Sequence, residues 1–299
     1  MSQNTLSIQL SVEECKMVNS ILSENGWKEA PIDNEYISLR MKNERGSVIT
    51  LYTSRKIVFQ GHEDFLNLVK KINSGGDVEI GEDKFFPHIG VDEVGKGDYF
   101  GPLVVVACFV DKDFVKVTKS LGVGDSKKFS DSRIMKMYSE MRNYPYYYSS
   151  VIYPAEYAEL INETKNVGIL LARQHSKVIE MALQDLKDKG VSSMNVVIDQ
   201  FSSSKDRVIN ELGELGRKIP LEQHHKGESD MAVACASVLA RGIFLEEMEK
   251  MSSKYDFDFP KGASNVINKA KEFVSKYGEE ELINVAKISF KTTRSVLVK

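Results

Sequence analysis

An unbroken apolar run, Leu103 to Val110, constrains the fold of this chain more than any other feature. Successive residues of a strand point to opposite faces, so a strand without polar side chains must be buried on both faces. A run of this length is typical of a strand, whereas a buried helix would be longer. Helical patterns at 130–143, 155–163, 169–187 and 231–251 supply segments that can cover both faces. The chain is therefore predicted to contain an α/β domain, with a mixed sheet flanked by helices.

Two predicted strands of this domain end in acidic residues. The apolar segment 86–91 is followed by Asp92 and Glu93, and the short segment 195–198 is followed by Asp199. Such acids are often only polar residues that leave the core. An ionised carboxylate that points toward protein, however, needs a cation or a donor, and sites in α/β sheets collect beyond the strand ends. Clustered carboxylates suit Mg²⁺ or Mn²⁺, and these segments lack the histidine and cysteine ligands of zinc.

A further acidic segment, His224 to Asp230, precedes a helix with many small residues. A role in capping the helix is sufficient to explain Ser229 or Asp230. The adjacent histidines have no further ligands nearby in the sequence, so a zinc site is not predicted.

Two short motifs are weak signals for phosphate binding. Gly95-Lys96-Gly97 lets the backbone approach a ligand and offers a lysine to a phosphate. Asp125-Ser126-Lys127-Lys128 is equally typical of a solvated turn.

The chain is predicted to divide at a Gly-rich, acidic linker, residues 76–84, which separates a domain at 1–75 from one at 85–299. The first domain reads as strand, helix, three strands and helix, with a capping box at Ser11 and Glu14. One sheet face is apolar and the other is polar, either as an ordinary solvated face or as a nucleic-acid platform. The polar face comprises Ser7, Gln9, Tyr36, Ser38, Arg40, Lys42, Thr50, Tyr52, Lys56 and Gln60.

The formal net charge of −3 argues only weakly against a nucleic-acid partner, because carboxylates that hold cations offset a basic groove. No stretch approaches the roughly 20 apolar residues of a membrane span, and the first ten residues lack the features of a secretory signal. We therefore expect a cytoplasmic protein without membrane contact. Cys15, Cys108 and Cys235 are singletons, of which the last two are predicted to be buried thiols.

Four stretches, in this order, resemble the prokaryotic type 2 ribonucleases H: IGVDEVGKGDYFGPLVVVA, GDSKKFSD, VVIDQF and HHKGESDMAVACASVLAR. They cover most of residues 86–245 and imply a ribonuclease H-like catalytic domain. Within this family the chain is most like ribonuclease HIII, for two reasons. Its N-terminal region resembles the TATA-binding-protein-like module of HIII, and its KGES segment has glutamate where ribonuclease HII has aspartate.

The resemblance implies a catalytic and metal-binding set of Asp92, Glu93, Asp199 and Glu228, with Asp230 as the alternative fourth ligand. Two Mg²⁺ or Mn²⁺ ions would clamp the attacking water and the leaving oxygen, with Asp92 bridging both. Products would end in 3′-hydroxyl and 5′-phosphate. Gly95-Lys96-Gly97 would sense the 2′-OH that distinguishes RNA from DNA. The other implied nucleic-acid contacts are Ser126, Lys127, Lys128, Arg40, Lys42, Tyr52 and Lys56.

The implied function is that of a metal-dependent endoribonuclease, a monomer without an obligate protein partner, that hydrolyses the RNA strand of RNA–DNA hybrids. One alternative is HII-like incision at single ribonucleotides embedded in duplex DNA, against which the glutamate and the N-terminal domain argue. Another is a non-catalytic hybrid-binding protein, against which the presence of all four acids argues.

Overall fold

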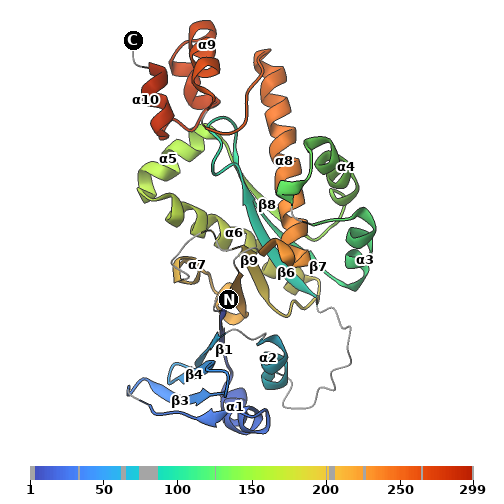
Figure 1. Ribbon diagram of the computed structural model, residues 1–299, viewed down its shortest axis with the longest axis vertical. Helices are drawn as coiled ribbons and strands as arrows, with labels where there is room; N and C mark the ends of the chain where they lie inside the picture. Colours follow the sequence, from blue (N-terminus) through green and yellow to red (C-terminus); the bar gives the residue numbers. More distant parts are fainter. Residues whose placement is uncertain are drawn as a thin grey trace.

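The computed structural model describes residues 4–32, 34–61, 65–73, 87–124, 126–199, 201, 206–224, 227–263 and 265–297. Its strands form one ten-stranded sheet in the order β2-β3-β4-β5-β1-β10-β9-β6-β7-β8 (Figure 1). β6, β9 and β10 are parallel, and the other neighbours are antiparallel. The strands are β1 Asn4–Gln9, β2 Lys28–Glu29, β3 Ile37–Lys42, β4 Val48–Tyr52, β5 Lys56–Gly61, β6 His88–Val94, β7 Leu103–Val110, β8 Tyr147–Ile152, β9 Val196–Asp199 and β10 Leu221–His224.

Helices cover both faces of the larger part of the sheet, as the apolar run predicts (Figure 1). α8 packs on β6 and β7 from one side together with α3 and α4, and α5 and α6 lie on the other side. The helices are α1 Val12–Glu24, α2 Leu66–Asn73, α3 Lys112–Leu121, α4 Asp131–Met141, α5 Pro154–Thr164, α6 Val167–Asp188, α7 Asp206–Glu211, α8 Met231–Tyr255, α9 Ile267–Tyr277 and α10 Lys291–Leu297, with short 3₁₀ turns η1 Ser126–Lys128, η2 Gly216–Lys218, η3 Gly227–Ser229 and η4 Glu280–Asn284.

Every residue of β7 is buried, and its side chains alternate between two cores. Val104, Val106 and Cys108 belong to the core under α8, whereas Val105 and Ala107 belong to the core under α6. The prediction of a mixed sheet flanked by helices is therefore confirmed. Cys108 and Cys235 are free and buried, as predicted. None of the helices in the described ranges is long and apolar enough to cross a membrane.

Residues 6–72 form a third core of their own, between the apolar face of β1, β3, β4 and β5 and the helices α1 and α2. The predicted capping box is present, since Ser11 accepts from the Glu14 backbone and Glu14 accepts from the Ser11 backbone. The predicted linker, residues 76–84, lies outside the described residues.

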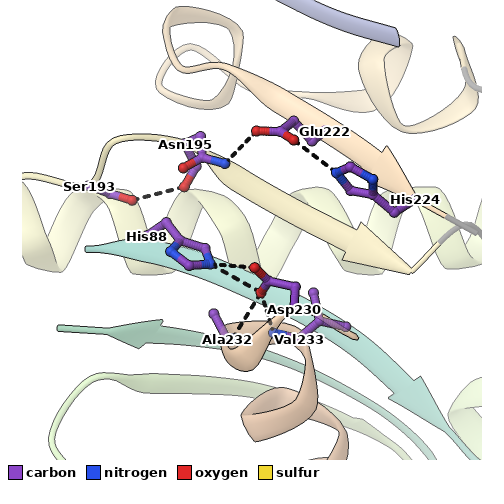
Figure 2. A network of polar contacts seen from close by, with 8 residues as sticks. All are labelled: His88, Ser193, Asn195, Glu222, His224, Asp230, Ala232 and Val233. Carbon is purple, nitrogen blue, oxygen red and sulfur yellow. Dashed lines mark hydrogen bonds and ion pairs between the residues drawn. The ribbon is translucent and has the colours of Figure 1, made fainter. Parts of the chain in front are cut away.

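Strand β10 joins the N-terminal part of the sheet to the rest, and the sequence pattern does not predict it. β1 pairs with β10 through Leu6 opposite Glu222 and Ser7 opposite Leu221. Its polar residues hide the strand from a search for apolar alternation. The buried Glu222 has partners for both carboxylate oxygens: Asn195 donates to one at 2.7 Å, and His224 Nε2 lies 2.8 Å from the other (Figure 2).

Candidate active site and metal centre

Asp92 and Glu93, near the end of β6, point to opposite faces of the sheet because neighbouring residues of a strand alternate. Asp92 faces α8, where Ser237 is its hydrogen-bond partner. Glu93 faces α6, where its Oε2 lies 3.0 Å from His175 Nε2. Both are nearly enclosed, with Asp92 8% exposed and the Glu93 side chain 7% exposed. The pair therefore divides between the two layers of the domain.

The described surroundings of Asp92 disfavour the charged form of its carboxylate. Burial raises its pKa, and the negative charge of Glu93 raises it further, to about 7. The hydrogen bonds from Ser237 and from the Glu93 backbone N–H, the latter at 2.8 Å, oppose this shift only in part. A buried carboxylate in this state is well suited to a bound cation, which would supply the missing positive charge.

Glu93 differs from its neighbour because two side chains stabilise its charged form. Burial alone would raise its pKa, but His175 and Lys96 hold the pKa below its usual value. Lys96 Nζ lies 3.1 Å from Oε1, opposite the oxygen that contacts His175. His175 is fully buried, and its ring centroid lies 4.7 Å from that of Phe201. The two carboxylate oxygens of Glu93 are thus oriented by Lys96 and His175.

Asp199 ends β9 on the same face as Asp92. The parallel register pairs Val91 with Ile198, so the next position along each strand brings Asp92 beside Asp199. The backbone N–H of Gly227 donates to Asp199 Oδ1 at 2.9 Å. A Cβ on residue 227 would lie 2.8 Å from the Asp199 Cα, so only glycine permits this approach. η3 and the backbone of Glu228 are consequently held against the end of β9.

The structure does not describe the side chain of Glu228, but it places Asp230 clearly. Asp230 is the N-cap of α8 and accepts from the backbone N–H groups of Ala232 and Val233 at 2.9 and 3.0 Å (Figure 2). Its other oxygen lies 2.9 Å from His88 Nε2. Although burial would raise the pKa of Asp230, the His88 contact and the two backbone donors lower it. The Asp230 carboxylate is therefore engaged by the helix start and by His88.

Ser126, one of the predicted nucleic-acid contacts, is linked to Asp92 through Ser237. Its hydroxyl lies 2.7 Å from that of Ser237, the partner of Asp92. Arg241 of α8 donates to the Ser126 carbonyl and, at 2.8 Å, to Asp131. The turn η1 is thereby fixed beside the candidate site. Lys128 is exposed, and the side chain of Lys127 lies outside the described part.

The loop after β6 carries the predicted Gly95-Lys96-Gly97 motif. Gly95 has φ +93°, and a Cβ there would lie 2.1 Å from the Pro102 carbonyl oxygen, so this position requires glycine. Lys96 and Gly97 are exposed, and nothing lies within 4 Å of a Cβ built on Gly97. The loop therefore presents an uncovered tip close to Glu93.

The predicted polar face of the N-terminal sheet follows from the strand register. Arg40, Thr50, Val58 and Ser7 form one row across β3, β4, β5 and β1. Alternation puts three further predicted residues on this face: Lys42, Tyr52 and Lys56. Thr50 is nevertheless 5% exposed, so the face is not uniformly solvated.

A cavity of about 270 Å³ lies where this polar face meets the rest of the molecule. Ser7 and Lys56 line it from the N-terminal sheet, and Asn210 and Arg217 line it from α7 and η2. The two cations therefore border the same opening from the two parts of the chain.

Asp92 and Asp199 offer hard oxygen donors on one face, the ligand type that Mg²⁺ and Mn²⁺ prefer. No group of three or more acidic, histidine or cysteine side chains that could hold an ion occurs among the described side chains, a set that does not include Glu228. The donor chemistry fits the predicted ions. His175, Ser237 and Arg241 are parts of the site that the sequence analysis missed. For His175 a signal exists, since it occurs on the apolar face of a helix, four residues after Leu171.

A family model described as Ribonuclease HII matches residues 89–293 of this chain. Ribonuclease HIII of Protochlamydia amoebophila (strain UWE25) is 36% identical over 264 residues, which cover 86% of each chain. Ribonuclease HIII of Streptococcus pneumoniae (strain P1031) is 33% identical over 293 residues, covering 96% of this chain and 97% of that protein. Among solved structures, Bst-RNase HIII in complex with Mn²⁺ aligns with a TM-score of 0.65 and 28% identity over 98% of each chain.

Proposed function

The chain belongs to the type 2 ribonuclease H family and is HIII-like, and from this premise we propose how its residues cleave the RNA strand of an RNA–DNA hybrid. The enzyme is a metal-dependent ribonuclease H. The proposed catalytic and metal-binding residues are Asp92, Glu93, Asp199 and Glu228.

The observation that carries this proposal is the pair of aspartates on the α8 face of the sheet. Asp92 and Asp199 occupy neighbouring positions of parallel strands, and burial raises the pKa of Asp92 to about 7. These residues, with Glu228 and Glu93, would hold two Mg²⁺ or Mn²⁺ ions. When bound, two such ions stabilise the attacking and leaving oxygens of the phosphate. Hydrolysis in this way leaves 3′-hydroxyl and 5′-phosphate ends.

The remaining residues of the site orient these carboxylates. His175 holds one oxygen of Glu93 at 3.0 Å, and Ser237 hydrogen-bonds to Asp92, so neither acid is free to turn away. Hydrogen bonds of this kind fix the direction of a metal ligand. The engagement of Asp230 by His88 and the start of α8 supports Glu228 as the fourth ligand.

Substrate binding is proposed to use both parts of the chain. The tip Gly95-Lys96-Gly97 would read the 2′-OH, and η1 with Ser126, Lys127 and Lys128 would hold phosphates. The polar face of the N-terminal sheet would bind the hybrid through Arg40, Lys42, Tyr52 and Lys56. The joint between β1 and β10 supports this role, because it sets the face at a defined place beside the catalytic part. One polypeptide supplies all these residues, so we propose that a single chain is active.

The test compares a long RNA–DNA hybrid with a DNA duplex that contains one ribonucleotide, each in Mg²⁺ and in Mn²⁺. We expect efficient cleavage of the hybrid and poor incision at the lone ribonucleotide, with products ending in 3′-hydroxyl and 5′-phosphate. An Asp92→Asn variant, prepared in the same way, controls for contaminating nucleases. Efficient incision at the single ribonucleotide would support HII-like activity instead, and cleavage of neither substrate would refute the proposal.

A further inference from the structure

Lys287, between η4 and α10, is a buried lysine whose Nζ donates hydrogen bonds to the loop that follows β6. Its side chain is 0% exposed. Nζ donates to the carbonyl oxygens of Asp98 at 2.9 Å and of Gly101 at 2.6 Å, and it lies 5.9 Å from the centre of the Tyr157 ring. All of these contacts of Nζ are with the backbone of one loop and with one aromatic ring.

Backbone contacts hold the same half of the loop. The N–H of Lys287 donates to Tyr99 O at 2.8 Å, and the N–H of Gly101 donates to Val285 O at 2.9 Å. From another direction, the Gly262 N–H donates to the Asp98 carboxylate at 2.7 Å. Several hydrogen bonds thus fix the backbone of residues 98–101, in contrast to the uncovered loop tip at Lys96 and Gly97.

Burying a lysine at this position costs free energy, because its charged form loses its hydration. Its presence therefore needs a physical reason. Burial lowers its pKa to about 7, and the nearby Asp98 charge opposes that shift only in part. An apolar side chain would avoid this penalty, but it would leave the carbonyls of Asp98 and Gly101 without their donor. Gly101, at φ +79°, turns the chain at the end of the loop. The Nζ donor therefore holds one particular course of the loop backbone.

We propose that Lys287 is a positioning residue for sugar discrimination: by pinning residues 98–101, it sets where the tip Gly95-Lys96-Gly97 meets the ribose. The inference deepens, and rests on, the proposed role of this tip in reading the 2′-OH. Rejection of a sugar without that hydroxyl depends on donors and acceptors held at fixed positions, and a small displacement weakens it. Discrimination would then depend on a residue almost two hundred positions away in the chain.

The test measures discrimination separately from stability. Hybrids that carry a single 2′-fluoro nucleotide, moved stepwise along the RNA strand, are compared with the unmodified hybrid by kcat/KM. The wild type, Lys287→Met and the control Lys271→Met are assayed well below their melting temperatures. Lys271 is an exposed lysine of α9, so its variant carries the same chemical change without the buried contacts.

We expect one position of the strand to show a large penalty in the wild type and in Lys271→Met. In Lys287→Met this penalty should shrink by about tenfold, the effect of misplacing one hydrogen bond, with little change in KM for the unmodified hybrid. A merely structural lysine would lower the melting temperature and leave the penalty unchanged, and that result would overturn the proposal. A wild type that cleaves no hybrid would count against the proposed function instead.

A second measurement uses the wild type alone and does not depend on the folding of a variant. Amide hydrogen exchange should be slow at Tyr99 and Gly101 and fast at Gly97, and a bound hybrid should protect only the tip. If the amides of residues 99 and 101 exchanged as fast as that of residue 97, the backbone of residues 98–101 would not be fixed, and the proposal would be wrong.

Discussion

The polar face of the N-terminal sheet and the ends of β6 and β9 both gather charged side chains, but they hold them in opposite ways. On the N-terminal face, Lys42 is exposed and Lys56 is half-buried. At the strand ends, Asp92 is enclosed, and the hydrogen bonds from its described neighbours offset the cost of burying its charge only in part. The charges of the N-terminal face are therefore in contact with water, whereas the Asp92 carboxylate is largely shielded from it.

This difference matches the proposed division of the molecule into a binding region and a catalytic region. Exposed cations cost little to maintain, and each contributes a small, salt-sensitive part of the affinity for phosphates. A buried carboxylate is costly to maintain, but a cation bound to it is positioned firmly and acts in a medium of low dielectric constant. Removing a charge should therefore have effects of different kinds in the two regions.

The largest effect is expected for Asp92→Asn. The change removes the charge of a proposed metal ligand, so kcat should fall by roughly 10⁴-fold, about 5 kcal/mol in the activation free energy. Affinity for the hybrid should change little, because the proposed phosphate contacts lie elsewhere. Loss of an uncompensated buried charge should also leave the metal-free protein as stable as the wild type or more so. Near-normal turnover, measured with the hybrid in Mn²⁺, would exclude the assignment.

Two acids two residues apart sharpen the comparison further. Glu228→Gln should lower kcat by roughly 10³-fold with little loss of stability, because it removes a proposed ligand. Asp230→Asn should keep most activity and lose about 1 kcal/mol of stability, because asparagine still caps α8 but forfeits the ion pair with His88. Hybrid cleavage and denaturant unfolding of both variants provide the measurement. The reverse pattern would make Asp230 the fourth ligand.

On the exposed side of the comparison, Arg40/Lys42/Lys56→Ala should weaken hybrid binding by about a hundredfold if all three residues contact phosphates. The slope of log K against log salt should flatten by about three units, one for each lost contact. Lys16/Lys71→Ala, which changes cations of α1 and α2 behind the sheet, is the matched control. Equal slopes for the wild type, the triple variant and the control would make the face a solvated surface only.

Substitutions test this face better than deletion of residues 1–75 would. The structure pairs β1 with β10, so the deletion would expose the edge of β10. An uncovered strand edge promotes association with other chains. Weak binding by the truncated protein would then have two causes that a titration does not separate.

Much of the fold could be predicted because it depends on local patterns. The apolar run at Leu103–Val110 indicated a strand buried on both faces, and the helical pattern at 130–143 corresponds to α4, with Ser130 as its N-cap. β10 escaped prediction because its burial depends on partners distant in the sequence, such as Asn195. α3 was not predicted either, although Asp111 caps it and Gly122 ends it in the left-handed conformation. The patterns that were missed are short or polar.

The site shows the same division. Strand ends indicated Asp92 and Asp199, and strand alternation indicated that Asp92 and Glu93 diverge. Ser237 and Lys287 gave no comparable signal. Ser237 occurs in a run of small residues, and Lys287 occurs in a polar segment typical of a surface. Their contacts are with Asp92 and with the loop at 98–101, so only the tertiary structure reveals what they do.

The last expected effect concerns Lys287, a cation that the catalytic part buries as it buries Asp92. Lys287 is buried, unlike Lys42, and its pKa is about 7 in the folded chain. In the unfolded chain it should be about 10.4. Between these values the unfolded chain binds more protons than the folded one, so the free energy of unfolding rises with pH. From pH 7 to pH 9 this group should add about 2 kcal/mol to the stability, and below pH 7 its contribution should be constant.

Other groups titrate over the same range, so the quantity to compare is the stability of the wild type minus that of Lys287→Met. Methionine has a similar length and no titratable group, and the difference should therefore become more favourable to the wild type by about 2 kcal/mol between pH 7 and pH 9. Lys271→Met changes an exposed lysine in the same way and is the control for the substitution itself. Urea unfolding at several pH values gives both curves. A flat difference for Lys287→Met would mean that this ammonium group is solvated like the cations of the N-terminal face, and the contrast between the two regions would not extend to lysine.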